Sequence, residues 1–168
     1  MICGWLFRAL AGVLFSISLL VPLSLQTEPR SRPEGVTPAE SRGKIIYTTG
    51  QSPSGRPLFY RLLSGEDFLP ARGVACANCH GLDGRGGREG NVVAPDITYG
   101  VLIKPSAAPL PSGRSRSPYT DGLLVRAITE GLDSSGNRLN SMMPRWSLSD
   151  SELQDLLKYL KRLDHTTD

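Results

Sequence analysis

The stretch that decides the fold of this chain is Cys76-Ala77-Asn78-Cys79-His80, a C-x-x-C-H motif. This spacing is the attachment signature of a c-type haem: two thiols bond to the vinyl groups of one porphyrin, and the adjacent histidine ligates the iron. The only other cysteine, Cys3, lies in an apolar leader. We therefore expect one covalent haem c, bound through Cys76 and Cys79, with His80 as an iron ligand.

Three other interpretations of the cysteine pair fit the sequence less well. A thioredoxin-like redox motif requires a βαβ context, and the flanking segments show no such pattern. A zinc site requires four ligands, commonly in two spaced pairs, and the sequence has no second C-x-x-C and no H-x-x-x-H. A disulfide across two intervening residues closes too short a loop to stabilise the fold much. The haem interpretation is therefore preferred.

The composition is ordinary for one modest globular domain, with 21% charged and 39% hydrophobic residues. The net charge is only +3. The cations are scattered, so no nucleic-acid-binding surface is predicted.

The N-terminal residues 1–26 differ in kind from the rest. Residues 9–25 carry no charge and are mostly apolar, and Arg8 directly precedes them. This pattern predicts a targeting segment that leaves the remainder in the periplasm or on the outer face of the cytoplasmic membrane. An A-x-A-like cleavage site is missing, and the segment nearly reaches the length of a bilayer. A cleaved signal peptide and a retained hydrophobic anchor helix both stay open.

Residues 27–39 are polar and proline-rich, which is typical of a flexible linker. The main domain is expected over residues 40–164, with a polar tail at 165–168. A first helix beginning at residue 39 is expected to end at Gly50, and a later one to run from the N-cap Thr120 to Gly131. The last helix is the best specified, because Ser149 and Glu152 form a capping box ahead of regularly spaced leucines.

Extended structure has little support in the sequence. Residues 56–63 fit a short hairpin and a helical turn equally well. The glycine-rich residues 81–90 are expected to form a flexible wrap, and the loop carrying Arg114 and Arg116 a solvated surface. We therefore predict an all-α fold.

A low-spin electron carrier needs a second iron ligand opposite His80, and the candidates are Met142, Met143 and His165. A thioether ligand would raise the reduction potential. Met143 is preferred over Met142 because the following Pro144 biases its backbone towards an extended conformation. The alternative is that both methionines only fill an apolar pocket. His165 lies in the polar tail and is expected to be solvated.

Taken with several further sequence features, the haem motif makes residues 40–163 resemble the monohaem class I cytochrome c family. The resemblance rests on Gly43 and Tyr47, on the haem motif followed by Gly81, on Pro95, on Met143-Pro144, and on the capped final helix. It implies a small helical domain around the haem, with the first and last helices crossing at Gly43, Tyr47 and Tyr159. It also implies that the Pro95 carbonyl accepts a hydrogen bond from the ring of His80, fixing the ligand.

The chain departs from the family pattern between Tyr47 and Cys76. Residues 48–75 form a longer connection than typical members have, and we interpret it as an inserted loop over one haem edge. The expected pocket walls are Leu82, Val93, Ile97, Leu123, Leu124, Ile128 and Trp146. Arg145 and Trp146 are candidate donors to a haem propionate.

Together these features predict a one-electron carrier that works with redox partner proteins such as a dehydrogenase, an oxidase or another cytochrome. It would contact the membrane through residues 1–26 if these are retained. Two alternatives stay open: a haem-bearing subunit of a dehydrogenase or oxidase complex, and a five-coordinate gas-binding or peroxidatic haem protein. The second requires an open iron site, and a Met-Pro loop argues against it.

Overall fold

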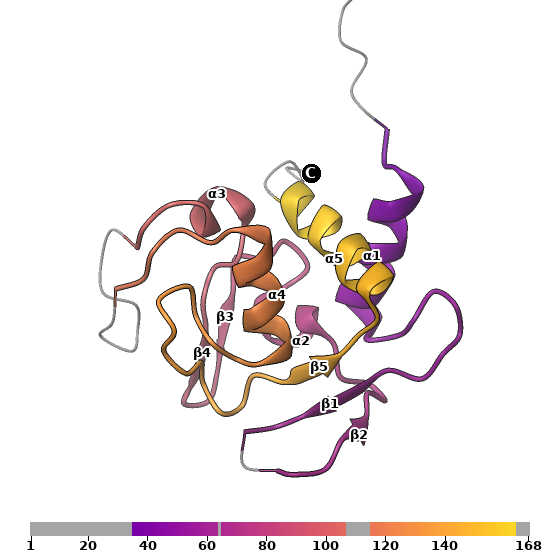
Figure 1. The fold of residues 1–168 in the computed structure, drawn as a ribbon, viewed down its shortest axis with the longest axis horizontal. Helices are drawn as coiled ribbons and strands as arrows, with labels where there is room; N and C mark the ends of the chain where they lie inside the picture. The colour runs from indigo at the N-terminus through magenta and orange to yellow at the C-terminus, as the bar shows by residue number, and fades with distance from the viewer. Residues whose placement is uncertain (1–34, 64, 107–114, 164–168) are drawn as a thin grey trace, which may run out of the picture. The chain divides into compact units, whose positions relative to one another are not determined.

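The computed structural model of the chain describes residues 35–63, 65–106 and 115–163 (Figure 1). The leader 1–26, most of the linker, residue Arg114, and the tail with His165 lie outside the described residues. Among the helices that are described, none has the length and apolar character needed to cross a membrane.

Two capped helices, α1 (Pro38–Thr49) and α5 (Asp150–Arg162), form the frame of the domain. Each begins with a capping box, Thr37 with Glu40 in α1 and Ser149 with Glu152 in α5. Gly50 ends α1 in the left-handed conformation, as the sequence predicts. Thr37 and Pro38, which were assigned to the linker, are the cap and first residue of α1, so the ordered domain begins before residue 40.

Helices α1 and α5 cross in close contact, side by side in Figure 1. The crossing is close because Gly43 has no side chain: a Cβ there would lie 2.0 Å from the backbone oxygen of Asp155. Tyr47 and Tyr159 pack beside it with ring centroids 5.3 Å apart. Arg42 donates to both carboxylate oxygens of Asp155, at 2.6 and 2.9 Å. The expected helix crossing is therefore present.

A Gly43→Ala variant tests this crossing. Because the added Cβ would meet backbone atoms, the helices must separate, and the free energy of unfolding should fall by about 3 kcal/mol, the upper end of typical overpacking costs. Gly122→Ala in α4 (Asp121–Thr129) is the control, since its Cβ would meet nothing within 4 Å. Urea unfolding should find Gly122→Ala as stable as the wild type or more so. Equal stability of the two variants would contradict the close crossing.

The start of α5 is tied to the segment after α1 through Glu152, whose side chain is only 9% exposed. Its carboxylate accepts hydrogen bonds from Ser52, at 2.5 Å, from the guanidinium of Arg56, and from Ser149. Burial alone raises the pKa of Glu152, but these hydrogen bonds outweigh it and lower the pKa from 4.5 to about 2. The folded state therefore prefers the ionised carboxylate.

Acidification should remove this contribution. Because the pKa of Glu152 is depressed in the folded state, its stabilisation is complete above about pH 4.5 and is lost as the pH falls towards 2. The total is on the order of 3 kcal/mol. Urea unfolding near pH 6 and near pH 3 should show a smaller acid-dependent loss in Glu152→Gln than in the wild type. The same loss in both proteins would refute the assignment.

In the part of the chain that the structure describes, three shorter helices follow α1 and precede α5: α2 (Cys76–His80), α3 (Tyr99–Leu102) and α4. Thr120 caps α4 through its side chain, and Gly131, with φ of 72°, follows its end, as predicted. The buried core joins α1, α4 and α5. Its members include Ile46, Leu124, Ala127, Ile128, Leu153, Leu156, Leu157 and Leu160.

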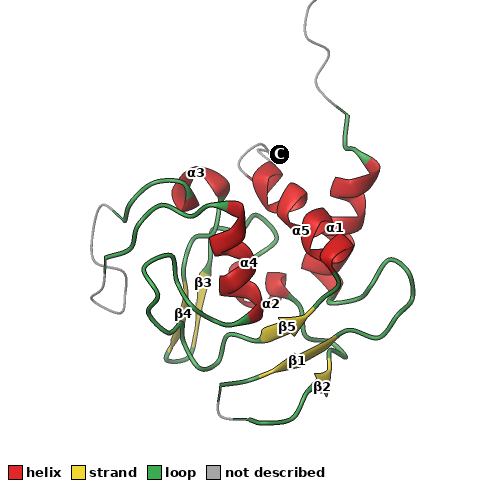
Figure 2. Ribbon diagram, viewed as in Figure 1, coloured by secondary structure: helices red, strands yellow, loops and turns green. Residues whose placement is uncertain are grey.

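The all-α prediction is wrong in one respect, because five short strands accompany the helices in the described residues (Figure 2). Strands β1 (Phe59–Arg61), β2 (Leu69–Pro70) and β5 (Arg145–Ser147) form an antiparallel sheet in the order β2-β1-β5. Strands β3 (Gly87–Glu89) and β4 (Val92–Ala94) form a separate antiparallel pair. Each is too short to show an alternating pattern, and backbone pairing rather than hydrophobic periodicity defines it.

The sheet shows how the 48–75 insertion is built. Strands β1 and β2 are the two paired arms of a hairpin within the insertion, and β1 also pairs with β5, with Tyr60 opposite Trp146. The rings of these two residues lie 5.9 Å apart. The insertion is thus hydrogen-bonded to the strand that follows Met143 and Pro144.

Candidate haem site

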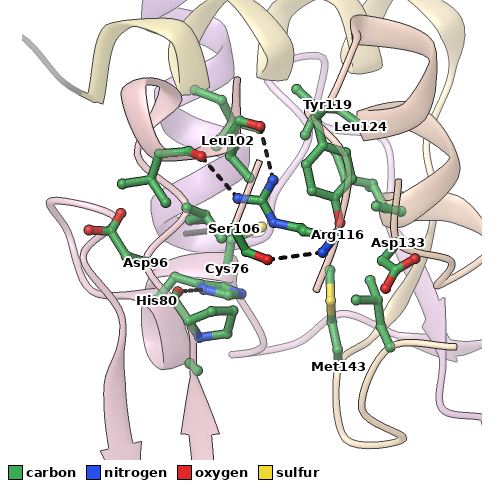
Figure 3. A pocket seen from close by; sticks show the side chains of 18 of the residues that line it. Cys76, His80, Asp96, Leu102, Ser106, Arg116, Tyr119, Leu124, Asp133 and Met143 are labelled. Carbon is green, nitrogen blue, oxygen red and sulfur yellow. Dashed lines mark hydrogen bonds between the residues drawn. The ribbon is translucent and has the colours of Figure 1, made fainter. Parts of the chain in front are cut away.

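An apolar pocket of about 600 Å³ lies within the domain, lined from α1, α2, α4, α5 and the segments before α3 and β5 (Figure 3). A second cavity of about 720 Å³ adjoins it, because Cys76, His80, Pro95, Met143 and Trp146 line both. This size and apolar lining are those of a cofactor pocket. Four of the five predicted site residues lie on the walls shared by both cavities.

His80 ends the short helix α2 and is 8% exposed. Its Nδ1 lies 3.0 Å from the carbonyl oxygen of Pro95, the partner that the resemblance implies. Burial lowers the pKa of His80, although the Pro95 hydrogen bond partly opposes the effect. A neutral ring whose Nδ1–H is held in this way has Nε2 free for a metal.

Two neighbours position α2 and Pro95. The Tyr47 hydroxyl donates to the carbonyl of Gly81, at 2.7 Å, and so joins α1 to the end of the haem motif. Gly86, with φ of 81°, leaves no room for a side chain, since a Cβ would lie 2.8 Å from the Pro95 oxygen. The Gly86 N–H donates to the His80 carbonyl. Gly86 thus supports Pro95 and His80. It was not singled out from the sequence, because residues 81–90 contain many glycines.

The two cysteines of the motif lie at the pocket and form no disulfide with each other. Cys76 is half-buried and lines both cavities, whereas Cys79 is exposed and lines the second. Burial raises the pKa of Cys76 to about 12, so its thiol is neutral. Both sulfurs are placed on one helical turn beside His80, as thioether attachment to one porphyrin requires.

Met143 approaches from the opposite side. It is half-buried and lines both cavities, and Figure 3 shows its thioether directed into the pocket across from His80. Met142 is 57% exposed and lines only the second cavity. Met143 is therefore better placed than Met142 to reach a bound haem, which agrees with the preference from the sequence.

Most, but not all, of the expected wall residues line the main pocket. Val93, Ile97, Leu124, Ile128 and Trp146 do so. The prediction is wrong for Leu82, which is 73% exposed because it follows Gly81 with φ of 76° and turns outward. It is also wrong for Leu123, which packs against the core without lining either cavity.

Arg116 corrects the expectation of a solvated loop. It is 8% exposed, lines the main pocket, and stacks 4.9 Å from the ring centre of Tyr119. Its guanidinium donates to the carbonyls of Val101, Leu102, Lys104 and Ser117 at 3.0–3.3 Å. An arginine in a Pro/Ser-rich segment gives no periodic signal of burial, which is why the sequence did not predict it.

Arg145 also lies elsewhere than expected. It is 2% exposed, and its guanidinium donates to backbone carbonyls of residues 131–143 rather than facing the pocket. The structure therefore gives no support to Arg145 as a propionate donor. Trp146 does line the pocket.

The site defines a class of protein: a small domain that attaches one haem through a C-x-x-C-H motif in an apolar pocket. Residues 65–164 match the family model named Cytochrome c, and the chain belongs to that family. It binds haem c covalently, through Cys76 and Cys79. No curated protein and no solved structure matches the chain significantly. Among the described residues, no group of three or more His, Cys, Asp or Glu side chains could hold a metal ion such as zinc.

Family membership also assigns the general activity, which is electron transfer through the haem rather than catalysis of a substrate reaction.

Proposed function

We propose that the protein is a one-electron carrier whose haem iron is ligated by His80 and Met143. One observation carries the proposal: these two side chains enter the same apolar pocket from opposite walls. With haem bound, His80 would supply an imidazole and Met143 a thioether to the iron. That ligand pair holds the iron low-spin and raises its reduction potential.

The bound haem supplies the change between ferric and ferrous iron, and the chain sets the conditions for it. Pro95 orients the His80 ring through the 3.0 Å hydrogen bond. Met143 closes the other face against solvent. The aliphatic side chains of Leu124, Ile128 and their neighbours exclude water, which reduces solvent reorganisation when the charge changes. Arg116 adds a buried positive charge to the same walls, while its guanidinium N–H groups donate to backbone carbonyls of Val101 and Leu102.

An open, catalytic iron site is less well supported. A peroxidatic or gas-binding site needs a vacant iron position with acid–base groups beside it, whereas Met143 enters the pocket across from His80. The two acidic residues in the pocket wall are committed to their own turns: Asp96 accepts hydrogen bonds from Thr98, and Asp133 accepts them from the N–H groups of Ser135 and Asn137.

The leader gives the proposed location. Its apolar run after Arg8 supports export to the periplasm or the outer face of the cytoplasmic membrane, where redox partner proteins would exchange electrons with the haem. Cell fractionation should find the holo-protein outside the cytoplasm, either free or bound to membrane through residues 1–26. Holo-protein found chiefly in the cytosol would contradict this location.

A second candidate is a haem-bearing subunit of a dehydrogenase or oxidase complex. The hairpin of the insertion favours it, because Leu63, Phe68 and Leu69 are each 44–51% exposed there. Large apolar side chains gathered on one short hairpin are typical of a surface that a partner covers. Both candidates use the same haem chemistry, and co-purification with a partner at fixed stoichiometry would favour the subunit.

The ligation is tested on the purified holo-protein. The ferric form should show a sulfur-to-iron charge-transfer band, and the ferrous form should bind carbon monoxide poorly because Met143 must first leave the iron. A ferric spectrum without that band, together with a ferrous form that binds carbon monoxide avidly, would refute the His/Met proposal and favour a five-coordinate iron.

A further inference from the structure

Arg145 is a buried charge without an acidic partner among the described residues. It begins β5, one residue after Pro144, and is 2% exposed. None of the ion pairs formed by the described residues includes it. Burial of an unpaired guanidinium is costly, so its surroundings must compensate through hydrogen bonds.

That compensation comes from one segment, residues 131–144, which we call the methionine loop. Nη1 of Arg145 donates to the carbonyl of Asn140, at 3.0 Å, and to that of Met143. Nη2 donates to the carbonyls of Leu139, at 3.4 Å, and Gly131, at 3.5 Å. The guanidinium thus links the beginning of the loop to its methionine end.

Gly131 is shaped to admit this guanidinium. A Cβ at Gly131 would lie 2.0 Å from Nε of Arg145 and 2.2 Å from its Cζ. Gly131 also bonds across the methionine loop, since its carbonyl accepts a hydrogen bond from the N–H of Leu139 at 2.8 Å. The loop closes around Arg145, and the space for the guanidinium exists only because residue 131 has no side chain.

We propose that Arg145 is a positioning residue for the axial methionine, an inference that rests on the proposed His80/Met143 ligation. The guanidinium holds the Met143 carbonyl and so fixes the backbone from which the thioether reaches the iron. A residue held in this way returns to the iron readily after it dissociates. Loss of the guanidinium should therefore increase the population in which Met143 is off the iron.

The first measurement is the affinity of the ferric holo-protein for imidazole, which competes with Met143 for the iron. Arg145→Leu should raise the apparent imidazole affinity about 10- to 100-fold, the range expected when hydrogen bonds to a charged group are lost. Arg145→Lys should give a smaller increase, because an ammonium keeps the charge but cannot span four carbonyls. The charge-transfer band should weaken in the same order.

Two alanine variants distinguish the loss of the Arg145 hydrogen bonds from the effect of backbone strain. Gly131→Ala and Gly136→Ala both place alanine at positive φ, 72° and 86°, but only the first Cβ meets Arg145, whereas the second meets nothing within 4 Å. Gly131→Ala should raise imidazole affinity and Gly136→Ala should not. In the Gly131→Ala, Arg145→Leu double variant the effects should be less than additive, because the clash is already gone.

A further control distinguishes the loss of the Arg145 hydrogen bonds from a general loss of stability. Arg42→Gln removes the guanidinium that pairs with Asp155 at the helix crossing, so it should lower resistance to urea without changing imidazole affinity. If Arg42→Gln raises imidazole affinity as much as Arg145→Leu does, the effect is global and the positioning role is refuted. An Arg145→Leu effect below about twofold in a protein that keeps its haem also refutes it.

Different results would refute the positioning role of Arg145 and the His80/Met143 ligation. If Met143→Ala abolishes the charge-transfer band while Arg145→Leu, Arg145→Lys and Gly131→Ala all leave imidazole affinity unchanged, only the positioning role is wrong. If Met143→Ala leaves the band intact, the His/Met ligation itself is wrong. Should Arg145→Leu not accumulate with haem, Gly131→Ala and Arg145→Lys still decide the question by the same measurement.

Discussion

A Met143→Ala variant is expected to lose the sulfur-to-iron charge-transfer band completely and to bind carbon monoxide readily in the ferrous state. The thioether that faces His80 across the pocket is then missing, and alanine has no donor atom that could replace it. The ferric iron should become high-spin or water-ligated. Visible and near-infrared spectra, with a carbon monoxide titration, measure both changes.

Met142→Ala is the matched control, because Met142 is the adjacent thioether but is 57% exposed and lines only the second cavity. It should keep the band and the low-spin iron. Met143→His should remain low-spin but lower the reduction potential by on the order of 100 mV, a fraction of the ~0.8 V that axial ligands span. Survival of the band in Met143→Ala with its loss in Met142→Ala would reverse the assignment.

The second large effect concerns the covalent bonds. A Cys76→Ala, Cys79→Ala double variant should carry no haem that survives acid–acetone extraction or denaturing electrophoresis, because it lacks both thiols that bond to the porphyrin. In-gel haem staining at the mass of the chain measures this directly. The wild-type chain should stain strongly under the same conditions.

The single variants Cys76→Ala and Cys79→Ala are the controls for this experiment. Each keeps one thiol and should retain some covalently bound haem, so the complete loss in the double variant cannot be attributed to the alanines alone. Haem that stayed with the double variant after extraction would disprove attachment through this motif.

The sequence predicted those parts of the molecule whose structure depends on interactions between residues a few positions apart. The capping box at Ser149 and Glu152 and the glycine after α4 mark helix ends by hydrogen bonds within a few residues, and both were predicted. The C-x-x-C-H spacing likewise encodes its chemistry within five residues. Met143 was distinguished from Met142 by the adjacent proline, which is again a local effect.

The features that the sequence did not reveal depend on how short strands and irregular segments are arranged in space. The sequence left a short hairpin open around β1, which pairs with the nearby β2, but it gave no sign that β1 also pairs with β5, over eighty positions later. Arg116 and Arg145 are buried because carbonyls of irregular segments converge on them, and no hydrophobic pattern accompanies such an arrangement. Leu82 was expected in the pocket on its apolar character, and the turn at Gly81 directs it outward instead.

The crossing of α1 and α5 also has a consequence for how the chain folds. The Arg42–Asp155 contact joins residues 113 positions apart, so the two helices that frame the core come from opposite ends of the domain. Such a contact carries a large loop-closure entropy and slows folding relative to a bundle of neighbouring helices. During synthesis α1 emerges long before its partner, so the core is completed only when α5 has been made. Until then the haem motif in α2 lies in a chain whose frame is still open, and α5 closes the domain over it.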